Sequence, residues 1–188
     1  MPDLKVTPTA LPEVLLVEPR IFGDARGFFF ESWNAKAFAA AGIDAAFVQD
    51  NQSRSGRGTL RGLHFQVRRP QGKLVRVIAG AAFDVAVDIR RSSPGFGKWV
   101  GVELSADNRK MLWVPPGFAH GFLALSDGCE FFYKATDYYA PEHERSIRWN
   151  DPALAIDWPL AGLGDGVVPV LSQKDASAPG FADAEVYA

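Results

Sequence analysis

The sequence predicts an all-β fold, a jelly-roll β-barrel, with one short N-terminal helix and a loop-rich C-terminal tail. Short β-prone segments follow one another at close, regular spacing, and Gly, Pro, Asn and Asp separate them, as in β-sandwiches and barrels. Residues 83–89 alternate apolar with small or polar side chains at period two, which is typical of a half-buried strand. With 188 residues the chain can bury a full core, and we expect one domain over residues 1–188.

The N-terminal third contains the one predicted helix. Asn34 is a good N-cap for a helix over residues 35–41, and Gly42 ends it. The predicted strands, two before this helix and eight after it, are residues 14–17, 27–31, 46–49, 59–66, 73–78, 82–89, 99–104, 111–114, 121–125 and 130–135.

The character of the chain changes after residue 136. Prolines divide the tail into short irregular pieces, which we expect to wrap around the barrel; they are Pro141, Pro152, Pro159, Pro169 and Pro179. We therefore place the core of the domain at about residues 14–136 and the wrapping segment at about residues 137–188.

Composition excludes several classes of partner. Twenty basic and 22 acidic residues give a net charge of −2 without a basic stripe, so no nucleic acid is expected. No apolar stretch approaches the roughly 18 residues of a membrane span. Cys129 is the only cysteine, so no intramolecular disulfide can form, and we predict a cytoplasmic protein.

His64 is the first residue that calls for an explanation, because it lies in the apolar run of residues 60–66 with Arg61. Ionisable groups in apolar strands are costly to bury unless they are paired. A lone histidine of this kind is more often structural than catalytic. On a regular strand, positions 61 and 64 face opposite ways. Arg61 and His64 can therefore meet one ligand only if the strand bends or bulges, or if a second subunit contributes.

His120 follows a proline-rich turn, and the spacing of Pro115, Gly117 and His120 resembles the second motif of the cupin superfamily. Metal-binding cupins also carry an H-x-H pair and a glutamate in their first motif. The corresponding stretch here, residues 63–66, holds a single histidine, His64. Two histidines without a third strong ligand make a poor metal site, so we predict no metal.

Other residues leave two interpretations open. Tyr133 either packs in the core or donates a proton in a cleft, and Lys73 is either a solvated strand-end lysine or a cation facing an enolate. Asp84 and Asp88 share a face of one strand and suit structural or catalytic roles equally. Asp175, in the tail, is by composition a surface aspartate.

Taken together, these segments resemble the dTDP-4-dehydrorhamnose 3,5-epimerase family, a metal-independent branch of the cupins. The resemblance runs from about residue 14 to residue 179. Each block is weak alone, but their order and spacing are specific; the blocks are residues 22–31, 48–51, 60–66, 71–76, 83–90, 116–122, 133–134 and 171–175.

The resemblance implies an isomerase that needs no cofactor. It would invert C3 and C5 of dTDP-4-dehydro-6-deoxy-D-glucose through an enolate, giving dTDP-4-dehydro-L-rhamnose. By the same resemblance His64 is the general base and Asp175 pairs with it. Lys73 stabilises the enolate oxygen, and Tyr133 returns the proton from the opposite face.

Further residues match ligand contacts of the family, which forms homodimers that exchange N-terminal strands. The resemblance implies that the nucleotide is held partly by the partner subunit, that Arg61 and His120 line the sugar and phosphate region, and that Tyr139 stacks on thymine. The full set of implied substrate-binding residues is Arg26, Phe29, Glu31, Gln49, Asp50, Asn51, Arg61, Lys73, His120, Tyr139, Glu144 and Lys174.

Three alternatives remain. An epimerase that acts on C3 only or C5 only would use the same residues. A metal-dependent cupin would need more ligands near His64 and His120. A non-catalytic sugar-binding jelly roll would leave the combination of base, acid and cation unexplained.

Overall fold

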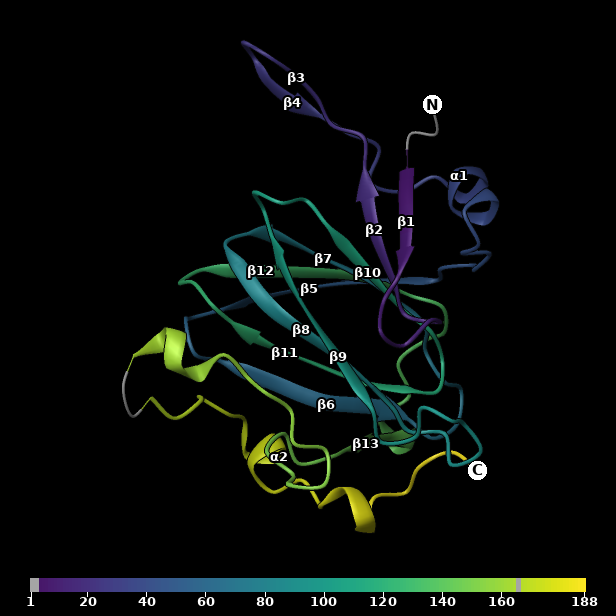
Figure 1. Cartoon of the computed structure of the whole chain (residues 1–188), viewed down its shortest axis with the longest axis vertical. Coiled ribbons are helices and arrows are strands. Elements are labelled where there is room, and N and C mark those ends of the chain that lie inside the picture. The colour runs from purple at the N-terminus through teal and green to yellow at the C-terminus, as the bar shows by residue number, and fades with distance from the viewer. Residues whose placement is uncertain (1–3, 165–166) are drawn as a thin grey trace.

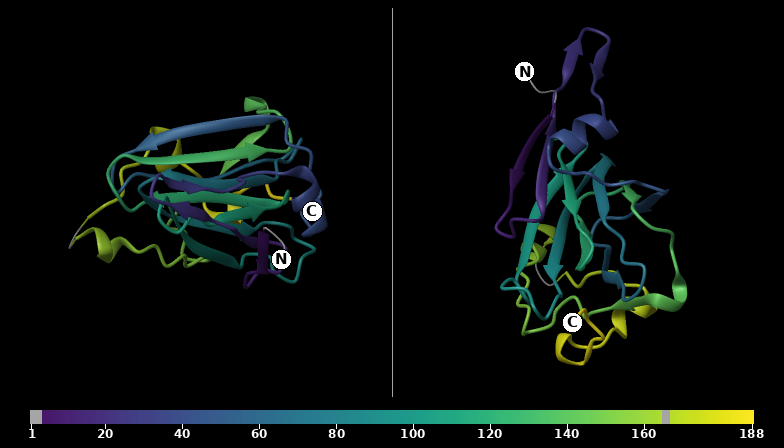
Figure 2. Two further views of the ribbon diagram at one scale, coloured as in Figure 1. Left: turned by 90° about the horizontal axis from the view of Figure 1, so that it is seen from above. Right: turned by 90° about the vertical axis from the view of Figure 1, so that its right-hand side faces the viewer.

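Two antiparallel sheets packed against each other form the centre of the fold (Figure 1). The computed structural model describes residues 4–164 and 167–188. The first sheet has six strands in the order β1-β2-β10-β7-β12-β5, and the second has five in the order β13-β6-β11-β8-β9. The left-hand view of Figure 2 shows these strands in stacked layers.

The strands follow one another closely along the chain. They are β1 (Leu4–Pro8), β2 (Leu15–Pro19), β3 (Phe22–Asp24), β4 (Gly27–Phe29), β5 (Gln49–Ser55), β6 (Leu60–Gln66), β7 (Lys73–Ala79), β8 (Ala81–Asp88), β9 (Trp99–Ser105), β10 (Met111–Val114), β11 (Phe118–Ala124), β12 (Cys129–Ala135) and β13 (Glu144–Ser146). The helices are α1 (Ala35–Ala40) and α2 (Gln173–Ala176), with short 3-10 helices at Pro141–His143, Leu160–Leu163 and Phe181–Asp183.

The predicted N-terminal helix is confirmed as α1. The Asn34 side chain accepts hydrogen bonds from the backbone N–H groups of Lys36 and Ala37, at 3.1 and 3.2 Å, as an N-cap does. Gly42 then takes a φ of +93°, which favours glycine and ends the helix. The helix buries Phe38 against Trp33, with ring centroids 4.5 Å apart.

The core lies between the two sheets and under the tail. Val75 and Val77 of β7 pack beside Phe131 of the neighbouring β12 and with Phe122 of β11, from the opposite sheet, in one buried cluster. The rings of Phe122 and Phe131 are parallel, with centroids 4.0 Å apart. A second cluster joins strands of the five-stranded sheet to the tail residues Ile147, Leu154 and Trp158. Burial of these side chains provides most of the stabilisation of such a fold.

The all-β prediction is confirmed, but the sheets do not close into a barrel. Within the described residues, β1 and β5 are the edges of the six-stranded sheet, and β13 and β9 those of the five-stranded sheet. The edge strand β5 contributes Asn51, Gln52 and Ser53 to the lining of a cavity.

The prediction for β5 was wrong in its boundaries, and β1, β3, β13 and α2 were not predicted. Residues 46–49 were expected as the strand, whereas β5 is Gln49–Ser55, a wholly polar segment with alternating burial. Apolar alternation signals a strand only where one face meets an apolar core. Because β5 meets the cavity, it carries no such signal.

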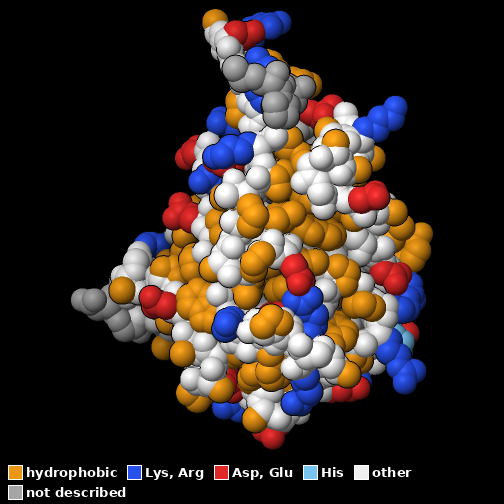
Figure 3. Space-filling model, turned by 45° about the vertical axis from the view of Figure 1, so that its right-hand side comes forward, with side chains coloured by type: hydrophobic (Ala, Val, Ile, Leu, Met, Phe, Trp, Pro, Cys, Tyr) orange, Lys and Arg blue, Asp and Glu red, His pale blue; other side chains and the backbone are white. Residues whose placement is uncertain are grey.

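The β3–β4 hairpin projects away from the sheets (Figures 1 and 2). It exposes three phenylalanines: Phe22 at 46%, Phe28 at 58% and Phe29 at 69% of their surfaces. On the face seen in Figure 3, Lys and Arg side chains are spread among hydrophobic and acidic ones. In the described part of the chain, no helix is both long and apolar enough to span a membrane.

Candidate active site

A cavity of about 520 Å³ opens between the two sheets beside the tail. Eight of the sequence-predicted site residues line it. Asn51, Lys73 and Tyr133 come from the six-stranded sheet, Arg61, His64 and His120 from the five-stranded sheet, and Lys174 and Asp175 from the tail.

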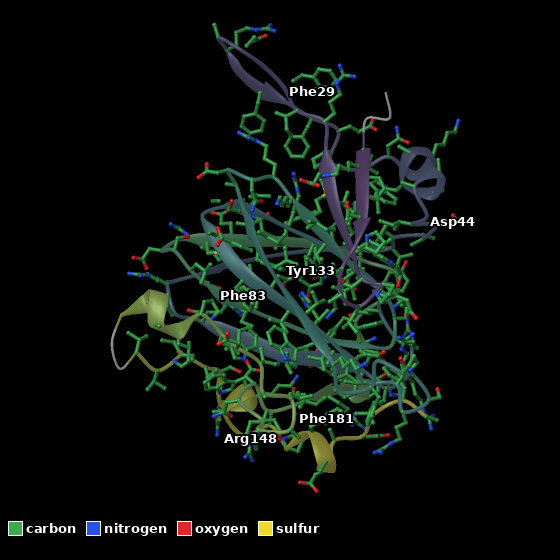
Figure 4. All side chains as sticks on the ribbon, viewed as in Figure 1. Phe29, Asp44, Phe83, Tyr133, Arg148 and Phe181 are labelled. Carbon is green, nitrogen blue, oxygen red and sulfur yellow. The ribbon has the colours of Figure 1, made fainter. Side chains whose placement is uncertain are left out.

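On the side of the six-stranded sheet, register places three polar residues together. Tyr133 lies directly opposite Asn51 in the β12–β5 pair. Lys73 lies opposite Ala135, two residues from Tyr133 on the same face. The Lys73 ammonium is 5.8 Å from the centroid of the Tyr133 ring. A cation and a phenol therefore share one wall, where Figure 4 labels Tyr133 between the layers.

A bulge in β6 brings Arg61 and His64 to the same cavity. In the pairing with β11, His64 lies opposite His120 and Arg61 opposite Phe122, so Gly62 and Leu63 together face Gly121. Gly62 has a φ of +121°, and a Cβ there would lie 2.5 Å from the Gly121 Cα. The sequence left open a bend, a bulge or a second subunit; the bulge is what occurs.

His64 is paired with a buried carboxylate. His64 Nε2 lies 2.5 Å from Asp175 Oδ1. Asp175 is only 3% exposed, so the interpretation of it as a surface aspartate was wrong. Composition cannot reveal that α2 folds back against β6. When the carboxylate accepts the Nε2 proton, Nδ1 is left as the basic nitrogen.

Ser172 holds Asp175 in place, and it was not singled out from the sequence. Its hydroxyl donates to Asp175 Oδ2 at 2.8 Å and accepts from the Asp175 backbone N–H at 3.1 Å. The Ser-x-x-Asp spacing before α2 is a helix-start pattern and is the signal that would have found it. Burial opposes ionisation of Asp175, but hydrogen bonds from His64 and Ser172 outweigh it and lower its pKa.

A second His–Asp pair faces the same cavity. His120 Nε2 lies 2.8 Å from Oδ1 of Asp84, which is fully buried on β8. Among the described residues, Asp84 Oδ2 has no hydrogen-bond partner. Of the two candidate carboxylates on β8, Asp84 thus belongs to the site, whereas Asp88 binds Arg90 and Ser93 at 2.8 and 2.5 Å.

The cavity shifts the ionisation of Lys73 and Tyr133. Burial lowers the pKa of Lys73 to about 8, although Asp84 and Glu144 oppose the shift. Burial, with the nearby Glu144 charge, raises the pKa of Tyr133. Near neutral pH, a protonated phenol and an ammonium with a readily lost proton therefore face the histidines.

A hydrogen-bonded group adjoins the cavity at Asn51 and Lys174. Gln49 donates to Asn51 Oδ1 at 3.0 Å and accepts from the Tyr139 backbone N–H at 2.9 Å. The Tyr139 hydroxyl donates to Glu144 at 2.7 Å, and Lys174 pairs with the same carboxylate. The bond to Glu144 raises the pKa of Tyr139 to about 12. Burial opposes ionisation of Glu144, but Lys174 and Tyr139 outweigh it and lower its pKa.

Seven predicted ligand contacts are not among the residues that line this cavity. Three of them adjoin it through the hydrogen-bonded group just described: Gln49, Tyr139 and Glu144. The other four lie elsewhere. Asp50 is on the other face of β5, where Lys134 donates to it at 2.8 Å. Arg26 and Phe29 are on the projecting hairpin and Glu31 follows it, and Figure 4 shows Phe29 far from Tyr133. In the described ranges, no three His, Cys, Asp or Glu side chains gather to hold a metal ion.

Comparison with known proteins decides the family. A model described as dTDP-4-dehydrorhamnose 3,5-epimerase matches residues 8–183. The chain belongs to this family. A dTDP-4-dehydrorhamnose 3,5-epimerase of Pseudomonas aeruginosa is 59% identical over 185 residues, which are 98% of this chain and 99% of that protein. The resemblance inferred from the sequence is thereby confirmed.

Solved structures of epimerases are similar to this chain over nearly its whole length. The dTDP-6-deoxy-D-glucose-3,5-epimerase of Legionella pneumophila, in complex with dTDP-4-keto-L-rhamnose, has a TM-score of 0.90 at 54% identity, over 95% of this chain and 93% of that one. A 3'-monoepimerase from Streptomyces bikiniensis, in complex with dTDP-quinovose, has a TM-score of 0.85 at 35% identity, over 93% and 87%. By identity, the chain is therefore nearer to these two 3,5-epimerases than to this single-centre enzyme.

Proposed function

We propose that this epimerase inverts C3 and C5 of dTDP-4-dehydro-6-deoxy-D-glucose, giving dTDP-4-dehydro-L-rhamnose. The observation that carries the proposal is the His64–Asp175 pair, 2.5 Å apart, in one cavity with Lys73 and Tyr133. Family membership supplies the substrate class. Proton removal and return leave the oxidation state of the sugar unchanged, so the reaction needs no redox cofactor.

His64 is the proposed base. The hydrogens on C3 and C5 both lie alpha to the C4 carbonyl, so removal of either proton gives an enolate on the same oxygen. Asp175 holds the imidazole in one tautomer and stabilises the imidazolium that forms. A positioned base of this kind typically contributes about 10²–10⁴-fold to the rate.

Lys73 and Tyr133 complete the proposed reaction. The Lys73 ammonium stabilises the enolate oxygen, a contribution that is often the largest in such chemistry. Tyr133, whose pKa is raised, keeps its proton until the enolate carbon takes it from the opposite face. Return of the proton to that face inverts the centre.

We propose that the site is completed in a homodimer. Arg26, Phe29 and Glu31 are family ligand positions, yet they lie on or beside the hairpin, away from the cavity of their own chain. The exposed phenylalanines of the hairpin support an apolar contact with a second copy. The partner's hairpin would then reach the nucleotide, which Gln49, Asn51, Tyr139, Glu144 and Lys174 also bind in this proposal. Asp50 has no such role here, because it lies on the other face of β5 and pairs with Lys134.

We further propose that the two sheets form the jelly roll of one cytoplasmic domain, with residues 14–136 as its core. The packing of Ile147, Leu154 and Trp158 against the five-stranded sheet supports a wrapping role for residues 137–188. The buried Cys129 thiol, whose pKa burial raises to about 11, fits a compartment where cysteines stay reduced.

Incubation with dTDP-4-dehydro-6-deoxy-D-glucose in deuterated water, followed by NMR, tests this function. We expect deuterium at both C3 and C5 of the product. Deuterium at one carbon only would instead identify a single-centre epimerase, and no incorporation with no turnover would contradict epimerisation.

A further inference from the structure

Gln66 occupies an unusual place beside the site. It lies two residues after His64 on β6, is only 3% exposed, and is not among the residues that line the cavity. A buried side-chain amide needs partners for both its donor and its acceptor. Gln66 therefore has to be explained by what its amide holds.

The amide of Gln66 holds the backbone on both sides of Tyr139. Its Oε1 accepts from the Ala140 backbone N–H at 2.8 Å. Its Nε2 donates to the carbonyl oxygens of Tyr138 and Arg69, at 3.3 and 2.8 Å. One side chain thus binds the residue before and the residue after Tyr139, and joins them to the turn that follows β6.

Tyr139 itself is fixed at three points but remains open. Gln66 holds its neighbours, Gln49 Oε1 accepts from its backbone N–H, and Glu144 accepts from its hydroxyl. Glu144 lies opposite Gln66 in the β13–β6 pair. The residue nevertheless remains 51% exposed. A rigid, exposed aromatic ring is preorganised to stack on a flat ligand, because the entropic cost of ordering the ring is met on folding and not on binding.

We propose that Gln66 is a positioning residue for nucleotide binding, which acts through Tyr139 by fixing the backbone on both sides of it. The inference rests on the proposed function, in which Tyr139 stacks on the thymine base. Gln66 makes no side-chain hydrogen bond to His64 or Asp175 in the described structure. Its loss should therefore weaken binding and leave proton transfer intact.

The test measures the Kd for dTDP by calorimetry, and kcat and KM with the keto sugar. Gln66→Met keeps the length of the side chain but removes all three hydrogen bonds. We expect the Kd and KM to rise about tenfold, equivalent to about 1.4 kcal/mol, with kcat within about twofold of wild type. Gln71→Met is the matched control, because Gln71 donates to Asp137 O at 2.8 Å but does not bind a neighbour of Tyr139.

Two further variants keep the proposal open to refutation. In a Tyr139→Ala background, Gln66→Met should change the Kd less than about twofold, because the ring it positions is gone. If Gln66→Met fails to fold, Gln66→Glu replaces it as the test. The glutamate can still accept a hydrogen bond from the Ala140 N–H but, as a carboxylate, cannot donate to the carbonyl oxygens of Tyr138 and Arg69. Binding of dTDP should therefore weaken severalfold.

Three results would overturn the inference. The Kd for dTDP could be unchanged in a folded Gln66 variant. Gln66→Met could weaken dTDP binding as much in the Tyr139→Ala background as in wild type, or Gln71→Met could weaken it as much as Gln66→Met does. The inference would also be overturned if kcat fell in a Gln66 variant while the Kd for dTDP stayed constant. Failure of the proposed function looks different: the wild type would bind dTDP, with Gln66 variants weaker, yet would not turn over the keto sugar.

Discussion

His64 and His120 lie opposite each other on neighbouring strands, and each directs Nε2 to a buried aspartate. The carboxylates differ in origin. Asp84 is part of the sheet, whereas Asp175 comes from a four-residue helix in the tail. The tail thereby fixes the tautomer of the proposed base, and we expect catalysis to be more sensitive to the tail than stability is.

Replacement of Asp175 by Asn tests this role. The amide cannot accept and stabilise the imidazolium proton as a carboxylate does, so kcat should fall about 10²–10⁴-fold with a smaller change in KM. Steady-state kinetics with the keto sugar measure both. Ser172→Ala, which keeps the carboxylate but loosens it, should give a smaller loss of kcat. An Asp175→Asn enzyme with near wild-type kcat would remove the dyad from the mechanism.

The partly buried Lys73 predicts a pH dependence. Lys73 serves as an ammonium and has a pKa of about 8, so kcat should fall as the pH rises through about 8. Unfolding restores the ordinary pKa of 10.5, so the unfolded chain binds more protons between pH 8 and 10.5. The contribution of this group to stability therefore increases with pH over the range in which activity declines.

Lys73→Met separates these two effects. It should lower kcat about 10²–10³-fold, because a charge that stabilises the enolate is lost. At pH 7 it should also raise the free energy of unfolding, because an unfavourably buried ammonium is removed. Paired kinetics and urea unfolding measure both. A variant that is less stable and still active would show that the lysine is structural.

At the scale of single elements, the β6 bulge determines which residues reach the cavity. A Cβ on Gly62 would lie 2.5 Å from Gly121 Cα, and Gly62 also needs its φ of +121°. Gly62→Ala should therefore cost about 1–3 kcal/mol of stability and displace Arg61 relative to His64, raising KM. Gly162→Ala is the control, because nothing lies within 4 Å of the added Cβ. Equal effects of both substitutions on unfolding and KM would refute the argument.

Elements that bury an apolar face could be predicted from the sequence, and the others could not. The strand β10 was predicted at its observed boundaries, and β7 and β8 within a residue, because their side chains face the core. The polar strand β5 faces a cavity, and the short β13 lies at an edge. For these, local composition does not indicate the pairing that forms them.

The site was predicted for a different reason. Periodicity alone gave His64 as a structural histidine and Asp175 as a surface residue; the order and spacing of the family blocks assigned both to the reaction. Asp84 was left open between a structural and a catalytic role, because its contact with His120 joins two strands and is not visible in the sequence. Ser172 was not singled out, although its spacing to Asp175 is a helix-start pattern.

At the scale of the whole molecule, the projecting hairpin makes a prediction about assembly. If Arg26 acts in the cavity of the partner, an Arg26→Ala homodimer lacks a hairpin contact and a His64→Asn homodimer lacks the base. Mixed dimers contain one site with both defects and one with neither. Co-refolding the two inactive variants should thus restore activity to about a quarter of the wild-type level per total protein, since half of the dimers are mixed and each has one intact site.

The complementation is read as turnover of the keto sugar after co-refolding, with each variant refolded alone as the control. Activity that stays at the level of the separate variants would place Arg26 in the site of its own chain or outside the reaction altogether.

The central claim is that His64 is the one base for both carbons and Tyr133 the opposing acid. The most direct test is to follow by NMR the exchange of substrate hydrogens with deuterated water in the variants His64→Asn and Tyr133→Phe. If His64 is the one base for both carbons, His64→Asn should lose exchange at C3 and C5 together. Tyr133→Phe should still exchange hydrogen but return it to the original face, giving deuterated substrate without inversion. Exchange at either carbon that persists undiminished in folded His64→Asn would contradict the account.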